Sequence, residues 1–300
     1  DTDQVVYVWF DALLNYATAV GLTDAPDSEG GKKFAQTWPA DVHLVGKDIL
    51  RFHAVIWPAM LMAAGLAVPK KVFAHGWLLV GGEKMSKSKL TGIAPSDITD
   101  HFGVDAFRYY FLRAIPFGSD GSFSWEDMSA RYTSELANDF GNLASRLAAM
   151  IEKYCEGKVP AVASGAELAQ ALTATVAKAD AAMVALDFQG GINAVMDFCK
   201  KVNGYVTEKE PWILAKDPAN KAELDEVLYN TAESLRALAV LLHPVMPATT
   251  EILWESLGAN ASIGSLGAQT ISNVAKWGQL PQGTVVTKTP VLFPRLEIKE

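Results

Sequence analysis

Cysteine is scarce in this chain of 300 residues, since only Cys155 and Cys199 occur, far apart and outside any Cys-x-x-Cys pattern. A disulfide framework is therefore excluded, and no structural zinc site is indicated. Hydrophobic residues make up 50% of the chain, yet no apolar stretch approaches the length of a membrane span. We expect a protein of a reducing, cytoplasmic compartment, without a membrane partner and without zinc.

Positive charge is also in short supply, because 26 lysines and arginines stand against 34 aspartates and glutamates, for a net charge of −8. Such a chain does not coat nucleic acid through bulk electrostatics, so any contact with RNA must be local. An initiator methionine is absent as well, and Asp1 to Gln4 lead straight into the apolar run Val5 to Phe10. We expect a fragment that begins inside a domain.

What is present up to about residue 80 is an alternation of short apolar runs with amphipathic segments. The expected elements are strands at 5–10, at 41–45 and from 72, and helices at 11–20 and 49–64. Strands joined by helices predict a parallel sheet of the α/β type. Three strands are too few for an independent doubly wound fold, so a missing amino-terminal half of such a domain is expected as a partner.

The second half of the chain is almost wholly helical in pattern from Ser129 onward, after a helix and connector over 97–117. Further helices are predicted at 166–186, 191–206, 221–242 and 247–257, followed by a breaker-rich stretch at 258–282 and a strand-like run at 291–294. We therefore predict an α/β part at 1–80, a linker at 81–128, an all-α helical bundle at 129–282 and a tail at 283–300.

The motif Lys84-Met85-Ser86-Lys87-Ser88, preceded by two glycines, places two lysines and two hydroxyls within five residues. Each ammonium is a compact point charge for phosphate oxygens, and the glycines let the backbone approach closely. The motif follows the strand-like run 72–80 and precedes Pro95 and a helical pattern. This context favours a polyphosphate-binding loop over an ordinary solvated loop.

Two segments rich in aromatic residues flank the predicted strands. Trp9, Ala12, Leu13 and Tyr16 lie where a strand is expected to end and a helix to begin, which is where ligands bind in α/β sheets. In the second segment, the residues that share one helical face are Ile49, Phe52, His53, Ile56 and Trp57. These side chains can wall a pocket, and the alternative is that they are ordinary core.

Gly46 and Asp48 stand between the second predicted strand and the helix that follows it. A glycine at a strand end and a carboxylate that opens a helix are typical of a nucleotide site, in which the carboxylate accepts ribose hydroxyls. An N-cap role for Asp48 is the simpler alternative, and the two roles can coexist.

A polar row marks the flank of the first helix of the predicted bundle. At about 100° per residue, Asn138, Asn142 and Arg146 lie apart from the buried stripe of that helix. Amides and a guanidinium are suited to reading the edges of unstacked RNA bases, whereas most such rows merely face solvent. Trp212, in a Pro-Trp pair, is either a core residue or a platform for a base.

The lysine–serine motif resembles the second signature of the class I aminoacyl-tRNA synthetases, in which a mobile loop of this sequence grips the ATP phosphates. With the aromatic segments added, the chain is similar over essentially all 300 residues to the methionyl-tRNA synthetase family. The resemblance implies the second half of a Rossmann-type catalytic domain at 1–80, a linker and stem-contact region at 81–128, and a helical anticodon-binding domain at 129–282.

The same resemblance implies four roles, each for a set of residues. The catalytic lysines are Lys84 and Lys87, and the ATP-binding residues are Gly46, Asp48, Lys84, Ser86, Lys87 and Ser88. The methionine pocket is lined by Trp9, Ala12, Leu13, Tyr16, Ile49, Phe52, His53 and Trp57, although Leu13 departs from the proline found in some members. The CAU anticodon is read by Asn138, Asn142, Arg146 and Trp212.

The implied activity is the activation of methionine with ATP and its Mg²⁺, followed by transfer of the methionyl group to tRNA(Met). The family's first signature, a His-x-Gly-His element, is missing from this sequence. This chain alone is therefore expected to be incomplete as an enzyme. Two alternatives stay open, namely another class I synthetase for an apolar amino acid and a non-catalytic tRNA-binding module.

Overall fold

The structure is a computed structural model that describes residues 3, 7–80, 83–84, 92–161 and 164–296. The chain divides into two compact units. Unit 1 consists of residues 1–78 and 118–120, and unit 2 consists of residues 79–117 and 121–300. Among the described residues no helix is both long and apolar enough to cross a membrane.

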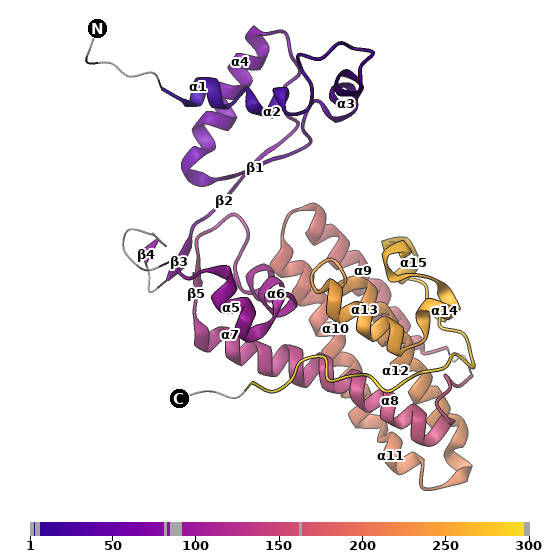
Figure 1. Ribbon diagram of the computed structural model, residues 1–300. Helices are drawn as coiled ribbons and strands as arrows, with labels where there is room; N and C mark the ends of the chain where they lie inside the picture. Colours follow the sequence, from indigo (N-terminus) through magenta and orange to yellow (C-terminus); the bar gives the residue numbers. More distant parts are fainter. Residues whose placement is uncertain (1–2, 4–6, 81–82, 85–91, 162–163, 297–300) are drawn as a thin grey trace. The chain divides into compact units, whose positions relative to one another are not determined.

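Unit 1 contains a pair of parallel strands, β1 (His43–Gly46) and β2 (Val72–His75), with His43 opposite Val72 and Gly46 opposite His75 (Figure 1). Its helical elements are α1 (Trp9–Ala12), α2 (Asn15–Thr18), α3 (Glu29–Thr37), the 3-10 helix η1 (Lys47–Ile49), the π-helix η2 (Phe52–Ile56) and α4 (Trp57–Ala63). Parallel strands joined by a helical crossover confirm the predicted α/β character of this part.

The strand predicted at 5–10 is wrong at its carboxyl end, and residues 5 and 6 lie outside the described residues. Trp9 and Phe10 are the first residues of α1, and the Leu13 amide donates to the Trp9 carbonyl at 3.1 Å. A short apolar run fits a strand or a buried helix equally well by periodicity. Tertiary packing decides here, because Leu13 and Ala17 are buried in one core with Trp57.

The helix predicted at 49–64 is present, but it changes type along its length from η1 through η2 to α4. In the π-helical turn the Trp57 amide donates to the carbonyl of Phe52, five residues earlier. The residue after Trp57 is Pro58, which has no N–H and whose ring collides with the carbonyl four residues earlier in a regular α-helix. The wider turn relieves that conflict immediately before the proline.

Unit 2 begins with a small sheet in the strand order β4 (Glu83–Lys84), β3 (Leu78–Val80) and β5 (Gly121–Phe123). The helix expected within 97–117 is split into α5 (Pro95–Phe102) and α6 (Val104–Ala114). The break falls at Gly103, whose φ of +84° is accessible to glycine at little cost. The helix α7 (Trp125–Arg131) follows, and its first turn is capped by the Ser124 hydroxyl, which accepts from the Asp127 amide at 3.2 Å.

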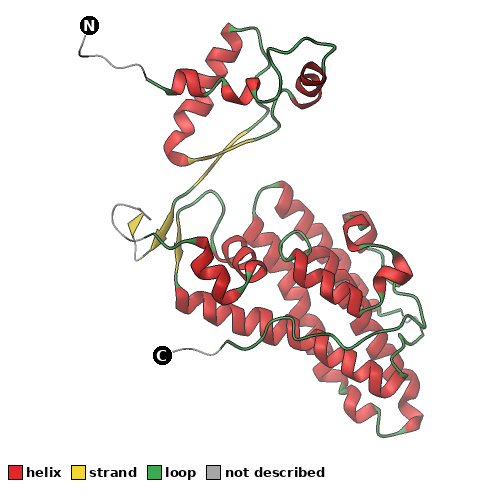
Figure 2. Ribbon diagram, viewed as in Figure 1, coloured by secondary structure: helices red, strands yellow, loops and turns green. Residues whose placement is uncertain are grey.

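The remainder of unit 2 is a helical bundle, as predicted (Figure 2). Its elements are η4 (Tyr132–Gly141, a π-helix), α8 (Asn142–Cys155), α9 (Ala166–Val184), α10 (Phe188–Lys209), α11 (Pro211–Leu214), η5 (Pro218–Asn220), α12 (Lys221–Leu242), α13 (Pro247–Ser256), α14 (Ala259–Ile263), η6 (Leu266–Ala268) and α15 (Ile271–Val274). Helix α10 packs against α9 and α12, and α12 packs against α8. The strand-like run predicted at 291–294 forms no strand, so that expectation is wrong.

A buried ion pair in the centre of the bundle holds residues 274–280, at and after the end of α15, against α12. Glu233 and Arg236, both on α12, are fully buried and lie 2.8 Å apart. The Glu233 carboxylate also accepts the backbone amides of Gln279 (3.1 Å) and Leu280 (2.9 Å). Arg236 donates to the Val274 carbonyl at 3.3 Å. The two charges thus satisfy backbone groups that have no regular secondary structure to pair with.

Candidate functional site

The predicted methionine-pocket residues of unit 1 come together as a cluster of rings. Trp9 stacks on Phe52 with 5.2 Å between ring centroids, and its ring meets the edge of His53 at 6.1 Å. Tyr16 lies 5.5 Å from the His53 ring and 6.2 Å from that of Trp57. Residues from two segments about 40 positions apart in the chain therefore meet at one place.

Two hydrogen bonds order this cluster. His53 Nδ1 lies 3.0 Å from the Ile49 carbonyl, and Tyr16 Oη lies 2.9 Å from His53 Nε2. A carbonyl only accepts, so His53 carries its proton on Nδ1, and Nε2 accepts from the tyrosine hydroxyl. The hydroxyl proton of Tyr16 is thereby directed at His53, and the oxygen lone pairs remain available.

The cluster has a buried back and an accessible front. Leu13 and Trp57 belong to the core of unit 1, and His53 is fully buried. The residues that keep accessible surface are Trp9, Ala12, Tyr16, Ile49 and Phe52. The front can therefore contact an apolar side chain, while Leu13 fills the core behind it.

The predicted adenosine-binding pair lies where β1 ends. Gly46 is the last residue of β1, and a Cβ placed on it would lie 2.6 Å from Oδ1 of Asp48. A side chain at position 46 would therefore displace the Asp48 carboxylate. Close by, Lys47 Nζ is 2.6 Å from the Asp120 carboxylate and 4.2 Å from the centroid of the Trp77 ring. The hydrogen bond from Lys47 is the main cause that lowers the pKa of Asp120.

The predicted phosphate loop is only partly described. The backbone of Lys84 ends β4, where it lies opposite Leu79 of β3. The other predicted ATP-binding residues of this loop, Ser86, Lys87 and Ser88, lie outside the described residues. Their roles stay predictions. Within the described part of the chain, no group of histidine, cysteine, aspartate or glutamate side chains could hold a metal ion.

The predicted anticodon residues form a second cluster, on unit 2. Asn142 donates from Nδ2 to Oδ1 of Asn138 at 3.5 Å, and both side chains are exposed. One turn later, the Arg146 guanidinium lies 5.5 Å from the centroid of the Trp212 ring, within cation–π range. Two exposed amides, a guanidinium and an indole from η4, α8 and α11 therefore share one surface.

Two polar groups behind this surface were not predicted from the sequence. Asn203 on α10 donates to the Asp139 carbonyl at 2.9 Å and supports η4 from the side of the bundle. Glu135, also on η4, is buried and accepts from Tyr109 at 2.5 Å and from Arg113 at 3.1 Å. Burial, followed by the Glu135 charge, raises the pKa of Tyr109. Nothing local in the sequence pairs these positions, which are 22 to 64 residues apart.

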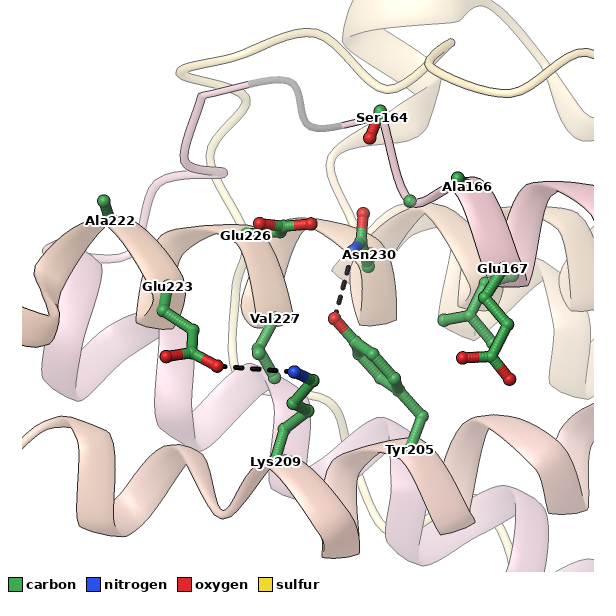
Figure 3. Close-up of a pocket in the computed structure, with 12 residues that line it drawn as sticks. Ser164, Ala166, Glu167, Tyr205, Lys209, Ala222, Glu223, Glu226, Val227 and Asn230 are labelled. Atoms are coloured by element: carbon green, nitrogen blue, oxygen red, sulfur yellow. Dashed lines mark hydrogen bonds and ion pairs between the residues drawn. The ribbon is translucent and has the colours of Figure 1, made fainter.

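Figure 3 shows a cavity of unit 2, of about 540 Å³, that is lined mainly by residues of α9, α10 and α12. None of the four predicted anticodon residues lines it. Its charged lining residues are Glu167, Lys209, Glu223 and Glu226. The single lysine is already paired with Glu223 at 3.3 Å, as the dashed line in Figure 3 shows. Glu167 is likewise paired, with Lys201 at 2.6 Å, so the lining offers a phosphate group an excess of carboxylate and an ammonium that is already engaged, and this cavity does not suit RNA.

Comparisons with known families agree with this arrangement. The family described as tRNA synthetases class I (M) matches residues 1–148, and the anticodon-binding domain of tRNA ligases matches residues 166–277. The α/β part and the helical bundle thus define a class I aminoacyl-tRNA synthetase, in which part of the catalytic domain precedes a helical anticodon-binding domain.

Individual relatives narrow the class further. The methionine–tRNA ligase of Streptomyces coelicolor is 63% identical over 306 residues, covering 100% of this chain and 56% of the relative. The methionine–tRNA ligase of Caldanaerobacter subterraneus is 45% identical, covering 100% of this chain and 46% of the relative. The solved Mycobacterium tuberculosis methionyl-tRNA synthetase in complex with methionyl-adenylate is 38% identical, with a TM-score of 0.88 over 97% of this chain and 56% of that structure.

This chain belongs to the methionyl-tRNA synthetase family, which confirms the resemblance inferred from the lysine–serine motif and the aromatic segments. It spans about half the length of the curated relatives it matches.

Proposed function

We propose that this chain supplies most of the methionine pocket, the phosphate loop and the anticodon-binding domain of a cytoplasmic methionine–tRNA ligase. The complete enzyme forms methionyl-adenylate from methionine and ATP with its Mg²⁺, and then transfers the methionyl group to tRNA(Met). The first signature of the family is supplied, in this proposal, by an amino-terminal half that corresponds to relatives' sequence which this chain does not span. The observation that carries the proposal is the aromatic cluster of unit 1.

The chemistry of that cluster suits methionine. A thioether is polarizable and unbranched, and it makes favourable contacts with aromatic rings, which Trp9, Tyr16 and Phe52 provide. A misfit of one methylene discriminates by only about 1–3 kcal/mol, so several walls must act together. The buried back of the cluster, with Leu13 and Trp57, limits how deep a side chain can enter.

Activation begins when a carboxylate oxygen of methionine attacks the α-phosphorus of ATP. The bond from the α-phosphorus to the bridging oxygen of the β-phosphate breaks, and pyrophosphate leaves with the electron pair. Negative charge on the phosphate oxygens is neutralised by Lys84 and Lys87, and the hydroxyls of Ser86 and Ser88 donate hydrogen bonds. Lys87 acts on the charge that develops at the α-phosphate.

The adenosine of ATP binds beside Gly46, with the Asp48 carboxylate accepting its ribose hydroxyls. The support for this role is that the Asp48 carboxylate occupies the space where a Cβ of residue 46 would be, so only glycine leaves the carboxylate in place.

Recognition of tRNA(Met) takes place on unit 2. The indole of Trp212 stacks on an unpaired anticodon base, and the side chains of Asn138, Asn142 and Arg146 read base edges. The support for this role is the convergence of the four side chains, three of them exposed, on a chain whose overall charge of −8 leaves RNA binding to local groups.

Pyrophosphate exchange with a panel of amino acids tests the proposal. The chain joined to an amino-terminal half from a family member is assayed with methionine, leucine, isoleucine, valine and cysteine. Exchange that depends on methionine supports the proposal. Exchange that depends on another apolar amino acid shows a different class I synthetase. Absence of exchange, with tRNA binding retained, shows a non-catalytic tRNA-binding module.

A further inference from the structure

His43 is a buried histidine of unit 1 to which neither the sequence motifs nor the activation chemistry gives a role. It is the first residue of β1, and its side chain is 6% exposed. Its Nε2 accepts the indole N–H of Trp57 at 3.2 Å, in a hydrogen bond buried from solvent. Its ring lies 4.5 Å from the ring of Tyr16 and 5.8 Å from that of His53. His43 thus touches three predicted pocket residues from behind.

The protonation state of His43 follows from its partner. An indole N–H only donates, so Nε2 of His43 must be unprotonated and the neutral ring carries its proton on Nδ1. Burial, followed by the electrostatic interaction with the nearby His53, lowers the pKa of His43, in agreement with a neutral ring. The two histidines therefore have different hydrogen-bond partners. His53 fixes the hydroxyl of Tyr16, while His43 holds the indole of Trp57 and backs the Tyr16 ring.

We propose that His43 is a positioning residue of the amino-acid pocket, which fixes the orientation of the buried Trp57 and of the accessible Tyr16 so that the pocket receives an unbranched thioether side chain. The proposal rests on the proposed function of the aromatic cluster. Trp57 is fully buried, so its indole N–H has no water to turn to if the acceptor is lost. Without the His43 acceptor, the Trp57 indole rotates toward another acceptor, and this rotation changes the shape of the pocket.

Two substitutions separate the acceptor from the bulk of the ring. His43→Phe keeps a flat ring against Tyr16 but removes the acceptor, whereas His43→Gln keeps an acceptor oxygen. The first readout does not depend on activity: the indole N–H signal of Trp57 is followed by NMR in the 300-residue chain labelled with ¹⁵N-tryptophan. We expect slow hydrogen exchange of this N–H in the wild type and in His43→Gln, and fast exchange in His43→Phe.

The second readout is the steady-state kinetics of pyrophosphate exchange in the complete enzyme. We expect His43→Phe to raise the KM for methionine about tenfold, equivalent to about 1.4 kcal/mol. The KM for ATP and kcat should change less than about twofold, because the phosphate site is untouched. His43→Gln should restore most of the methionine affinity. The control is His101→Gln, an exposed histidine of unit 2, which should leave every constant unchanged.

A double-mutant cycle distinguishes loss of the His43–Trp57 hydrogen bond from a folding defect. Trp57→Phe removes the N–H donor, so His43→Phe and His43→Gln should have the same KM for methionine in that background. A wild-type KM for methionine in His43→Phe overturns the proposal, and so does an unchanged exchange rate of the Trp57 N–H. An equal loss of kcat and of affinity for both substrates also overturns it, as a general structural role. Failure of the wild type to use methionine overturns the proposed function instead, and this inference with it.

Discussion

Replacement of Trp212 by alanine is the sharpest test of the proposed anticodon surface. Trp212 is the second residue of the four-residue helix α11. This helix starts directly after Glu210, whose φ of +44° ends α10. Stacking of a base on an aromatic side chain contributes about 1–3 kcal/mol, and about 1.4 kcal/mol corresponds to a tenfold change in Kd. Trp212→Ala should therefore raise the Kd for tRNA(Met) by about 5- to 150-fold.

The assay is fluorescence anisotropy of a labelled anticodon stem-loop of tRNA(Met), titrated with the 300-residue chain. The salt concentration is held constant, because phosphate contacts make the Kd strongly dependent on salt. The matched control is Ile213→Ala, the next residue of α11, whose side chain is 43% exposed and is truncated in the same way. This control should change the Kd less than about twofold, since surface truncations away from special features have small effects.

A double-mutant cycle between Arg146 and Trp212 extends this test. The Arg146 guanidinium lies over the Trp212 ring, and cation–π pairs at exposed sites contribute about 0.5–1 kcal/mol. In a double-mutant cycle, the losses from Arg146→Ala and Trp212→Ala should fail to add by about that amount. Wild-type affinity in Trp212→Ala, with an unchanged melting temperature, would refute the placement of the anticodon on this surface. An equal loss in Ile213→Ala would assign the effect to distortion of α11.

Three further predictions concern stability and catalysis. Glu233→Gln leaves the buried Arg236 without its counter-charge and should lower the free energy of unfolding by about 3–5 kcal/mol in urea denaturation. An unchanged midpoint would show that the ion pair does not hold residues 274–280 against α12. Lys87→Ala in the complete enzyme should slow methionyl-adenylate formation by about 10²–10³-fold with methionine affinity nearly unchanged, and normal pyrophosphate-exchange turnover would remove Lys87 from the mechanism. The lowered pKa of His43, whose ring faces the titratable groups of Tyr16 and His53, means that the unfolded chain takes up a proton first as the pH falls. The contribution of neutral His43 to stability is therefore complete above about pH 6.5 and is lost as the pH falls through the lowered pKa. Melting temperatures measured between about pH 5 and pH 8 should consequently fall more steeply toward acid in the wild type than in His43→Gln.

The aromatic cluster could be predicted from the sequence because helical spacing alone places Phe52, His53 and Trp57 on one face. The meeting of that face with Trp9 and Tyr16 followed from the resemblance to a known family rather than from any local pattern. The structure shows the physical link, since rings from both segments stack and the Tyr16 hydroxyl bonds to His53.

The burial of His43 could be predicted from the local sequence, but its hydrogen-bond partner could not. The burial of His43 and Val45 around the exposed Leu44 follows the two-residue period of a strand, so an inward-facing histidine could have been deduced from β1. Its partner could not, because Trp57 is 14 residues further on and meets it only after the chain has turned from β1 into the helical run.

The polar row on unit 2 starts on a backbone feature that the sequence pattern did not predict. Four residues of a regular α-helix advance 40° beyond a full turn at about 100° per residue, which still leaves the side chains of Asn138 and Asn142 as neighbours on one face, so the row itself could be predicted. The π-turn of η4 could not, and in it the Asn142 amide donates to the carbonyl of Ala137, five residues earlier. The two side-chain amides lie 3.5 Å apart, and Asn203 supports the same turn by donating to the Asp139 carbonyl. Because Asn203 supports this π-turn, we expect a substitution at Asn203 to alter RNA binding by the proposed surface without removing any of its four side chains.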